Sequence, residues 1–376
     1  MRILVLSKRM YMGKDLLDDR FGRFRELPLE LATLGHDVMG ICLSYQQRQK
    51  GLFTDVSKDG TAQVHWHSMN IGRLVIPGLI HYLREVKRLS LQYRPDLIWC
   101  CSDSFHAIFG VWLANRLNTK KVVDLYDNFE NYGATRFSGV LPLFRRAVRA
   151  ADGVTCVSKP LAERLFHSYR RSGPIAVLEN AVRRDLFYPQ DRTACRRLLG
   201  LPKDAKIIGT AGALYRSRGI RALFRGFELL AAKENNLHLA IAGPRDRCSQ
   251  IPNGPRVHDL GVLPLDEVPL LINALDVAVV CNRDSLFGRY CFPQKTYEVM
   301  ACRTPLVAAA VGSMKDMLDG YPECLFEPEA PQSCADAIRS QLIQPTVVDF
   351  DIPSWGDMAK RLETFLIKAT TSKTLA

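Results

Sequence analysis

The sequence lacks the short motifs by which several large enzyme classes are recognised. It contains no Walker A loop, no G-x-G-x-x-G, no H-E-x-x-H and no G-x-S-x-G. P-loop ATPases, dinucleotide-dependent oxidoreductases, zinc proteases and serine hydrolases depend on these patterns for phosphate binding, metal binding or nucleophilic attack. Internal repeats and low-complexity tracts are missing as well. We therefore set these four classes aside and expect ordinary globular domains.

Long apolar runs are also missing. No stretch approaches the roughly 18 uninterrupted apolar residues of a membrane span, and the run at residues 2–6 is too short for a signal peptide. The 11 cysteines show no C-x-x-C spacing, and several lie in apolar runs, which indicates buried thiols in a reducing compartment. We expect a cytoplasmic protein, and peripheral binding to the inner face of the membrane stays open.

Positive charge is abundant and unevenly distributed. The formal net charge is +12; residues 1–180 hold 26 Lys and Arg against 17 Asp and Glu, whereas the remainder holds 25 against 22. A basic N-terminal half suits an anionic membrane surface, and so do the mixed basic and apolar residues at 74–91 and 137–149. A merely solvated basic face is the equal alternative. Nucleic acid is not an expected partner, because the sequence lacks the aromatic and basic interleaving of a stacking platform.

Short β-rich apolar runs alternate with amphipathic segments along the chain. The first series of runs lies at residues 2–6, 37–43, 96–100, 121–125 and 153–157. The second series lies at residues 207–211, 238–242, 256–260, 277–281 and 306–310. This alternation predicts parallel sheets covered by helices. The expected fold class is α/β, with two doubly wound, Rossmann-like sheets.

The chain is predicted to have two domains and a terminal helix. Its 376 residues exceed what one core usually organises, and a stretch rich in charge and proline separates the two series. We place an N-terminal domain at residues 1–182 and a C-terminal domain at 183–352. Residues 353–376 show apolar positions at helical spacing, and we expect this helix to return to the N-terminal domain.

Residues 289–309 resemble the donor-binding segment of GT-B glycosyltransferases in the large retaining family 4. The shared residues keep the family's order and spacing: Pro293, Lys295, Glu298, Met300, Ala301 and Pro305. Weaker matches follow along nearly the whole chain, among them residues 35–38, 151–158, 179–182 and 242–244. The resemblance implies a GT-B fold, in which two Rossmann-like domains face across a cleft, and an enzyme of the hexosyltransferase type.

A loop entering a helix is predicted at residues 293–301, with Lys295 in its first turn and Glu298 on the same side. When a bond between a sugar and a diphosphate breaks, negative charge collects on the diphosphate, and cationic side chains or a helix N-terminus can neutralise it without a metal. Lys295 is therefore predicted to face the phosphates, while Glu298 reaches the ribose hydroxyls. The resemblance implies the same roles, with Pro293 as part of the donor-binding segment.

Arg218 stands where the family usually has Lys before Gly, in the loop after the first strand of the C-terminal half. A guanidinium there would clamp a diphosphate oxygen. Gly212 and Gly219 permit close approach of the backbone to a ligand, although ordinary turn geometry is the alternative explanation for both. The chain departs from the family at Tyr290, which replaces a common glutamate, so we expect other groups near this position to contact the donor sugar.

In the N-terminal half, the family often places a His or an acid after the fourth strand, facing the reacting sugar. The corresponding residue is Asp127, which we predict acts as a base or stabilises oxocarbenium charge. Asp103 and His106, after the preceding strand, are the next candidates. Strand ends form the ligand-binding edge of an α/β sheet, which favours these positions, but helix capping by Asp127 is the alternative.

We expect no metal and no cofactor, with the nucleotide sugar as substrate. The one D-x-D spelling, Asp349 to Asp351, lies in a loop before the terminal helix, so chance explains it. In metal-dependent transferases this motif ends a mid-chain strand beside the donor.

The favoured function is sugar transfer from a nucleotide donor, UDP slightly ahead of GDP, to a lipid-linked or cell-surface glycan, with retention and without metal. One alternative is a nucleotide-sugar 2-epimerase of similar architecture. It needs acids and bases at both faces of the sugar, and the C-terminal half offers no matching His-rich or Glu-rich cluster. The other alternative is a degenerate, non-catalytic transferase-like binding protein, for which Tyr290 is the best support.

Overall fold

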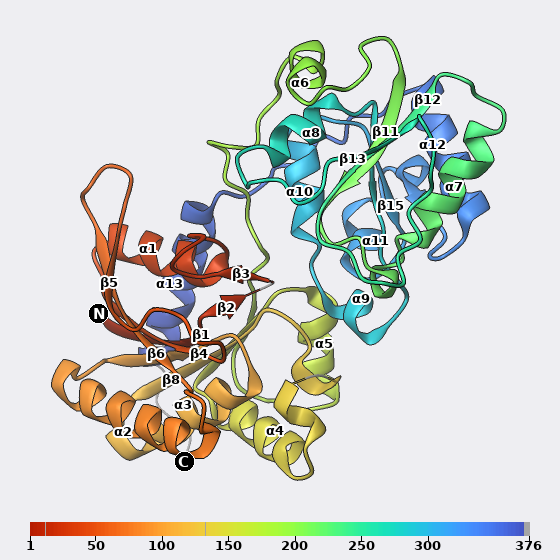
Figure 1. The fold of residues 1–376 in the computed structure, drawn as a ribbon. Coiled ribbons are helices and arrows are strands. Elements are labelled where there is room, and N and C mark those ends of the chain that lie inside the picture. Colours follow the sequence, from red (N-terminus) through yellow and green to blue (C-terminus); the bar gives the residue numbers. More distant parts are fainter. Residues whose placement is uncertain (12, 132, 372–376) are drawn as a thin grey trace. The chain divides into compact units, whose positions relative to one another are not determined.

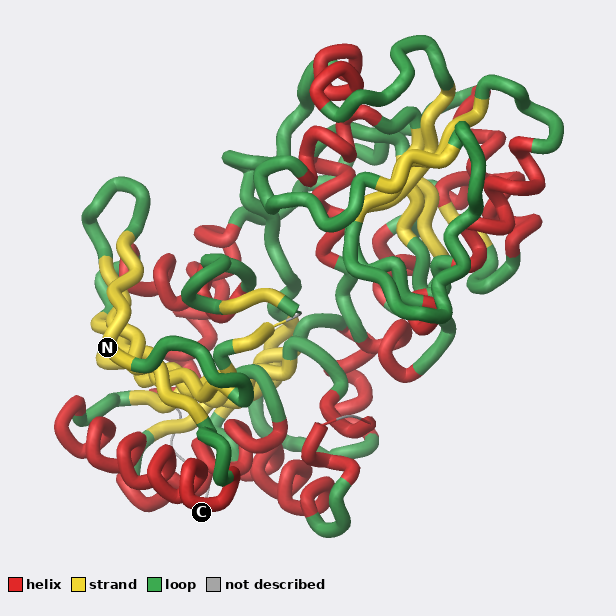
Figure 2. Tube along the Cα trace, in the orientation of Figure 1, coloured by secondary structure: helices red, strands yellow, loops and turns green. Residues whose placement is uncertain are grey.

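The chain divides into two compact units, each with its own sheet (Figures 1 and 2). The N-terminal unit comprises Met1–Asn180 and Trp355–Ala376, and the C-terminal unit comprises Ala181–Ser354. Our structure, a computed structural model, describes residues 1–11, 13–131 and 133–371. In both units the main sheet is predominantly parallel and covered by helices, so the expected pair of Rossmann-like α/β domains is confirmed.

The N-terminal unit contains an eight-stranded sheet in the order β10-β9-β8-β7-β1-β4-β6-β5. Its strands are β1 (Arg2–Lys8), β4 (Asp37–Ser44), β5 (Gly51–Val56), β6 (Gln63–Asn70), β7 (Leu97–Cys100), β8 (Lys120–Leu125), β9 (Gly153–Cys156) and β10 (Ile175–Val177). Neighbouring strands are parallel except β5 and β6. A separate antiparallel ribbon joins β2 (Met10–Tyr11) and β3 (Lys14–Asp15).

Helices cover this sheet on both faces, as its apolar strands require. β7 and β9 are buried along their whole length, which is typical of parallel strands packed between two helical layers. The covering elements are α1 (Arg23–Thr33), α2 (Val75–Tyr93), α3 (Ser104–Leu117), α4 (Val140–Ala150), α5 (Lys159–His167) and the turns η1 (Phe129–Asn131) and η2 (Gly133–Arg136).

The terminal helix α13 (Trp355–Thr371) belongs to the N-terminal unit and packs against α1. Its apolar face is buried, and Glu363 Oε1 lies 2.8 Å from His36 Nε2. A Cβ placed on Gly153 would stand 2.8 Å from the ring of Phe365, so the helix lies directly on β9. Residues 372–376 of the predicted terminal segment lie outside the described residues.

The C-terminal unit contains a six-stranded, fully parallel sheet in the order β13-β12-β11-β14-β15-β16. Its strands are β11 (Lys206–Ala211), β12 (Leu237–Ala242), β13 (Val257–Asp259), β14 (Val277–Val280), β15 (Leu306–Ala309) and β16 (Leu325–Phe326). The helical elements are α6 (Arg192–Leu198), η3 (Arg216–Arg218), α7 (Arg221–Ala231), α8 (Val268–Ala274), α9 (Leu286–Tyr290), α10 (Gln294–Ala301), α11 (Ser313–Met317), η4 (Pro322–Cys324) and α12 (Pro331–Ile343).

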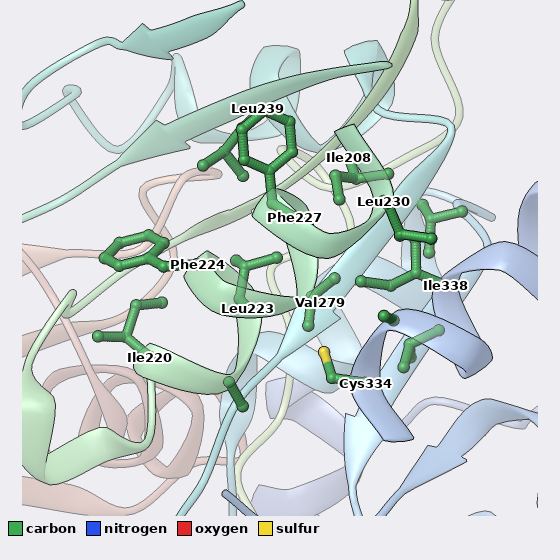
Figure 3. Close-up of a cluster of buried hydrophobic side chains, with 14 of the residues drawn as sticks. Ile208, Ile220, Leu223, Phe224, Phe227, Leu230, Leu239, Val279, Cys334 and Ile338 are labelled. Atoms are coloured by element: carbon green, nitrogen blue, oxygen red, sulfur yellow. The ribbon is translucent and has the colours of Figure 1, made fainter. Parts of the chain in front are cut away.

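Helices α7 and α12 cover one part of this sheet and share a core with it (Figure 3). Leu223 and Phe227 of α7 are buried one turn apart, and Cys334 and Ile338 face them from α12. This spacing makes α7 amphipathic, because residues three and four apart share a helix face. Its opposite side is exposed and charged.

The sequence analysis missed several strands and the structure of the linker. Strands β5 and β6 were not predicted, and most of β5 is exposed at the sheet edge, where polar positions obscure the apolar pattern. Strands β2, β3, β10 and β16 were also missed, because each has only two or three residues. The predicted linker between the two series contains α6, whose buried Arg196 donates from Nη2 to Asp276 Oδ2 at 2.7 Å. This segment is therefore fixed to the C-terminal unit. In the described part of the chain, no helix combines the length and apolar character that a membrane span requires.

Candidate functional site

The predicted loop and helix at the donor-binding segment are present. Pro293 is the N-cap of α10, with extended backbone angles, and the helix begins at Gln294. Lys295 therefore lies in the first turn and Glu298 one turn later. Gln294 Nε2 donates to Glu298 Oε1 at 3.1 Å, which holds that carboxylate along the helix. Both side chains are partly buried and retain some exposure to solvent.

Gly212 brings the end of β11 against the Lys295 side chain. Its φ of +124° is unfavourable for residues with a side chain, and a Cβ there would stand 2.8 Å from Lys295 Nζ. Gly243, after β12, also has a positive φ, and a Cβ there would stand 1.9 Å from the Gly212 carbonyl oxygen. At Gly243 the close contact is with backbone, so a side chain does not fit there; at Gly212 a Cβ would displace the flexible end of Lys295. The predicted residues Gly212 and Lys295 thus lie side by side.

Burial dominates the electrostatics of this cluster. It lowers the pKa of Lys295, an effect that Cys281 and Glu298 oppose and that the nearby cation Arg218 reinforces. Burial raises the pKa of Glu298 to about 7, with Lys295 and the hydrogen bond from Gln294 acting against the shift. Both groups are therefore held where their charged forms are disfavoured, and an added anion would favour the protonated form of Lys295.

Arg218 joins the cluster from the turn η3. Its guanidinium carbon lies 3.4 Å from the centre of the Phe287 ring, and such stacking restricts the orientation of the side chain. Phe287 belongs to α9, whose N-cap Ser285 accepts a hydrogen bond from the N–H of Gly288. Phe287 was not identified from the sequence, because the contact joins η3 to the distant helix α9. Tyr290, the departure from the family pattern, is the last residue of the same helix.

Asp127 lies just after β8 in the N-terminal unit, as the strand pattern predicted. It is buried, and its Oδ1 accepts a hydrogen bond from the backbone N–H of Asn128 at 2.7 Å. Asp103 is the N-cap of α3, and its Oδ1 lies 2.7 Å from His106 Nδ1. Burial opposes ionisation of Asp103, but His106 and then Lys8 outweigh it, so its pKa falls to about 2.

Lys8 is a member of this N-terminal cluster that the sequence did not identify. It ends β1, and its Nζ donates to the Tyr126 hydroxyl at 2.9 Å. Burial lowers the pKa of Lys8, while the charges of Asp103 and Asp127 oppose that shift. Because β1, β7 and β8 are neighbours in the sheet, their carboxyl ends bring these residues together. A lysine at a strand end resembles an ordinary solvated residue, which is why the pattern gave no signal.

A metal site is not apparent among these groups. Across residues 1–11, 13–131 and 133–371, no three His, Cys, Asp or Glu side chains are placed to hold a metal ion together. The D-x-D spelling at Asp349 and Asp351 lies between α12 and α13, outside any helix or strand. The expectation of a metal-free protein stays a prediction.

Two family models match the two halves of the chain. The model described as "Glycosyl transferase 4-like domain" matches residues 23–181, and the model described as "Glycosyl transferases group 1" matches residues 205–344. The chain belongs to the family-4-like glycosyltransferases. The residues of the Lys295 cluster all lie in the group 1 match.

Curated relatives match over part of their length. The D-inositol 3-phosphate glycosyltransferase of Geodermatophilus obscurus is 33% identical over 176 residues, which cover 42% of this chain and 38% of that relative. A D-inositol 3-phosphate glycosyltransferase of Catenulispora acidiphila is 29% identical over 216 residues, covering 53% of this chain and 50% of the relative. The chain therefore matches half or less of the length of these two relatives.

A solved structure of similar fold covers nearly the whole chain. Sucrose-phosphate synthase from Thermosynechococcus elongatus aligns with a TM-score of 0.71 and 19% identity, covering 98% of this chain and 96% of the other. HepE from Anabaena in complex with UDP aligns with a TM-score of 0.67 and 17% identity, covering 98% and 97%. At this identity the likeness is one of fold, and the fold of this family-4-like chain is GT-B.

Proposed function

We propose that the protein transfers a hexosyl group from a nucleotide sugar, UDP-linked in preference to GDP-linked, to a lipid-linked or cell-surface glycan. The observation that carries this proposal is the cluster of Lys295, Arg218, Gly212 and Glu298 in the C-terminal unit. It combines two cations, a backbone that admits close approach and a carboxylate one helical turn away. This is the combination that a diphosphate attached to a ribose requires.

The residues have distinct proposed roles. Arg218 and Lys295 neutralise the charge that develops on the diphosphate as the sugar leaves, which is the largest electrostatic demand of the reaction. Glu298 accepts hydrogen bonds from the ribose hydroxyls, and its ionised form makes the stronger bonds. Asp127 is the proposed base or oxocarbenium-stabilising residue of the N-terminal unit. In this scheme two cations meet the charge requirement, so we propose that transfer needs no metal.

UDP is favoured by two kinds of support. The family resemblance favours it slightly, and solved structures of the similarly folded HepE contain UDP or UDP-glucose. Transfer with retention rests on the resemblance to the retaining family. The released nucleotide tests the preference for UDP, and the anomeric configuration of the product tests retention.

The N-terminal unit is the proposed site of the acceptor and of contact with an anionic membrane. The first two turns of α2 and the residue before them expose Leu74, Val75, Ile76 and Ile80, with Leu74 and Ile76 each 72% exposed. Basic residues follow on the same helix, including Arg84 and Lys87. An apolar group beside basic residues fits the boundary between headgroups and acyl chains. Co-sedimentation with anionic and neutral vesicles tests this contact.

The test of transfer compares the wild type with Lys295→Met in the presence of UDP-sugars, GDP-sugars and lipid or glycan extracts. Removing one cation from the leaving-group site is expected to reduce turnover about 100- to 1,000-fold, the range seen when one stabilising donor is lost. Lys206→Met, an exposed lysine at the start of β11, is the matched control and should keep full activity.

Two outcomes contradict the proposed transfer. Epimerised sugar in the donor pool without an acceptor would identify the 2-epimerase. Tight nucleotide binding without turnover on any extract would identify a non-catalytic binding protein. EDTA treatment that abolishes turnover, with recovery on adding Mg²⁺ or Mn²⁺, would contradict the metal-free mechanism.

A further inference from the structure

The outer face of α7 borders a cavity that the proposed transfer does not use. Leu223 and Phe227 point into the core of the C-terminal unit (Figure 3), whereas Arg221 and Arg225 are exposed on the other side of the helix. Between this helix and the loop at residues 247–253 lies a cavity of about 560 Å³. This volume falls within the roughly 300–1,000 Å³ of small-molecule sites.

Arginine dominates the lining of this cavity. Arg216, Arg221, Arg225 and Arg247 all contribute to its wall. Glu228 is the one acid among its lining residues, and its Oε2 already lies 2.6 Å from Arg225 Nη1. The lining therefore carries a clear excess of positive charge.

Three of these guanidinium groups have no partner within the described residues. The side chains of Arg216, Arg221 and Arg247 make no ion pair or hydrogen bond there. Asp246 is close in sequence, but its carboxylate accepts hydrogen bonds from the Ser249 hydroxyl at 2.6 Å and from the Arg216 backbone N–H at 3.1 Å. These bonds shape the loop and leave the three guanidinium groups without a facing acid.

The cavity is separate from the Lys295 cluster. None of Gly212, Arg218, Lys295 and Glu298 is among its lining residues. Arg216 and Arg218 are the two ends of the turn η3, and Arg218 is stacked on Phe287 instead. An anion in the cavity would therefore not occupy the position proposed for the donor diphosphate.

We propose that this cavity, which we call the α7 groove, binds a ligand that carries two or more phosphate groups, independently of the donor. One guanidinium group can donate two parallel N–H···O hydrogen bonds to a phosphate. Guanidinium groups that share a groove without an acid repel one another until an anion neutralises their charge. Ile220 and Phe224 line the same cavity and give it an apolar portion. The phosphates belong either to a free oligophosphate or to the headgroup of an anionic lipid.

The experiment measures tripolyphosphate binding to the full chain by calorimetry, with and without UDP. The test variant is Arg221→Gln/Arg247→Gln, and the control is Lys203→Gln/Lys206→Gln, which removes the same charge from exposed positions of the same unit. We expect the test variant to bind tripolyphosphate at least tenfold more weakly and the control to stay within about twofold of the wild type, because only the groove residues contact the ligand.

Two results would overturn the proposal. One is that the wild type does not bind tripolyphosphate. The other is that both double variants lose the same affinity for it, which would show that the net charge of the unit and not the groove determines binding. The outcome for the α7 groove does not depend on whether the protein transfers sugar, because UDP binding and turnover are measured separately. Co-sedimentation with vesicles that contain cardiolipin, whose headgroup carries two phosphates, distinguishes the sources. Weaker vesicle binding by the test variant alone assigns the groove to lipid headgroups, and unchanged vesicle binding with weaker tripolyphosphate binding assigns it to a free ligand.

Discussion

The two units surround a partly buried lysine in different ways. Lys295 in the C-terminal unit lies near another cation, Arg218, and burial raises the pKa of its one nearby carboxylate, Glu298. Lys8 in the N-terminal unit lies between the charges of Asp103 and Asp127 and bonds to Tyr126. The Lys295 cluster therefore has an excess of positive charge, whereas the two acids largely compensate the charge of Lys8. The difference supports the proposed binding of a diphosphate at the first cluster.

Filling the space beside Lys295 is expected to have the largest effect. Gly212→Ala places a Cβ 2.8 Å from Lys295 Nζ at a φ of +124°, so the lysine must move. We expect UDP affinity to fall about 10- to 100-fold, which corresponds to about 1.4 to 2.7 kcal/mol. Calorimetric titration with UDP measures the change.

Gly254→Ala is the matched control for Gly212→Ala. Gly254 has a similar φ of +134°, but a Cβ there meets nothing within 4 Å. Both variants should lose a comparable amount of stability, about 1 to 3 kcal/mol, through backbone strain. If Gly254→Ala lowers UDP affinity as much as Gly212→Ala does, strain alone explains the effect and the contact with Lys295 is irrelevant.

The second prediction concerns the pH dependence of Glu298. Its pKa of about 7 in the folded protein exceeds the value of about 4.3 in an unfolded chain, so the folded state holds the proton more tightly. The stabilising contribution is present at low pH and is lost as the pH rises from about 4 through 7. The free energy of unfolding of Glu298→Gln should therefore equal that of the wild type near pH 4 and exceed it by about 1 to 3 kcal/mol at pH 8. Urea unfolding at both pH values measures this difference.

UDP affinity should fall in the same variant, although its stability rises. An amide cannot replace the charged hydrogen bonds to ribose, so Glu298→Gln is expected to weaken UDP binding at pH 8 by about 1 to 3 kcal/mol. Glu234→Gln, at an exposed position of the same unit, should change neither quantity. Stabilisation without a loss of UDP affinity would show that the Glu298 carboxylate is buried for a reason other than nucleotide binding.

The sequence predicted the parts of this protein that depend on local patterns. Apolar runs located the central strands, and the spacing of Pro293, Lys295 and Glu298 located α10 and its first turn. Contacts between distant segments were out of reach, because periodicity carries no information about which loops meet. The Arg218 stack on Phe287 joins the turn η3 to helix α9, and the α7 groove needs both α7 and the loop at residues 247–253. The roles of the site residues, including Asp127, stay predictions.

The smallest expected effect tests the compensated cluster of the N-terminal unit. Lys8→Met removes the cation near Asp103 and Asp127, but it also removes the cost of burying an ammonium group, so the two effects partly cancel. We expect a loss of about 1 kcal/mol in the free energy of unfolding at pH 7, measured by urea denaturation. Lys87→Met, at an exposed position of α2, should change it by less than about 0.5 kcal/mol. A more stable Lys8→Met protein would mean that the desolvation penalty of the Lys8 ammonium group exceeds its attraction to the two acids. The N-terminal cluster would then resemble the Lys295 cluster.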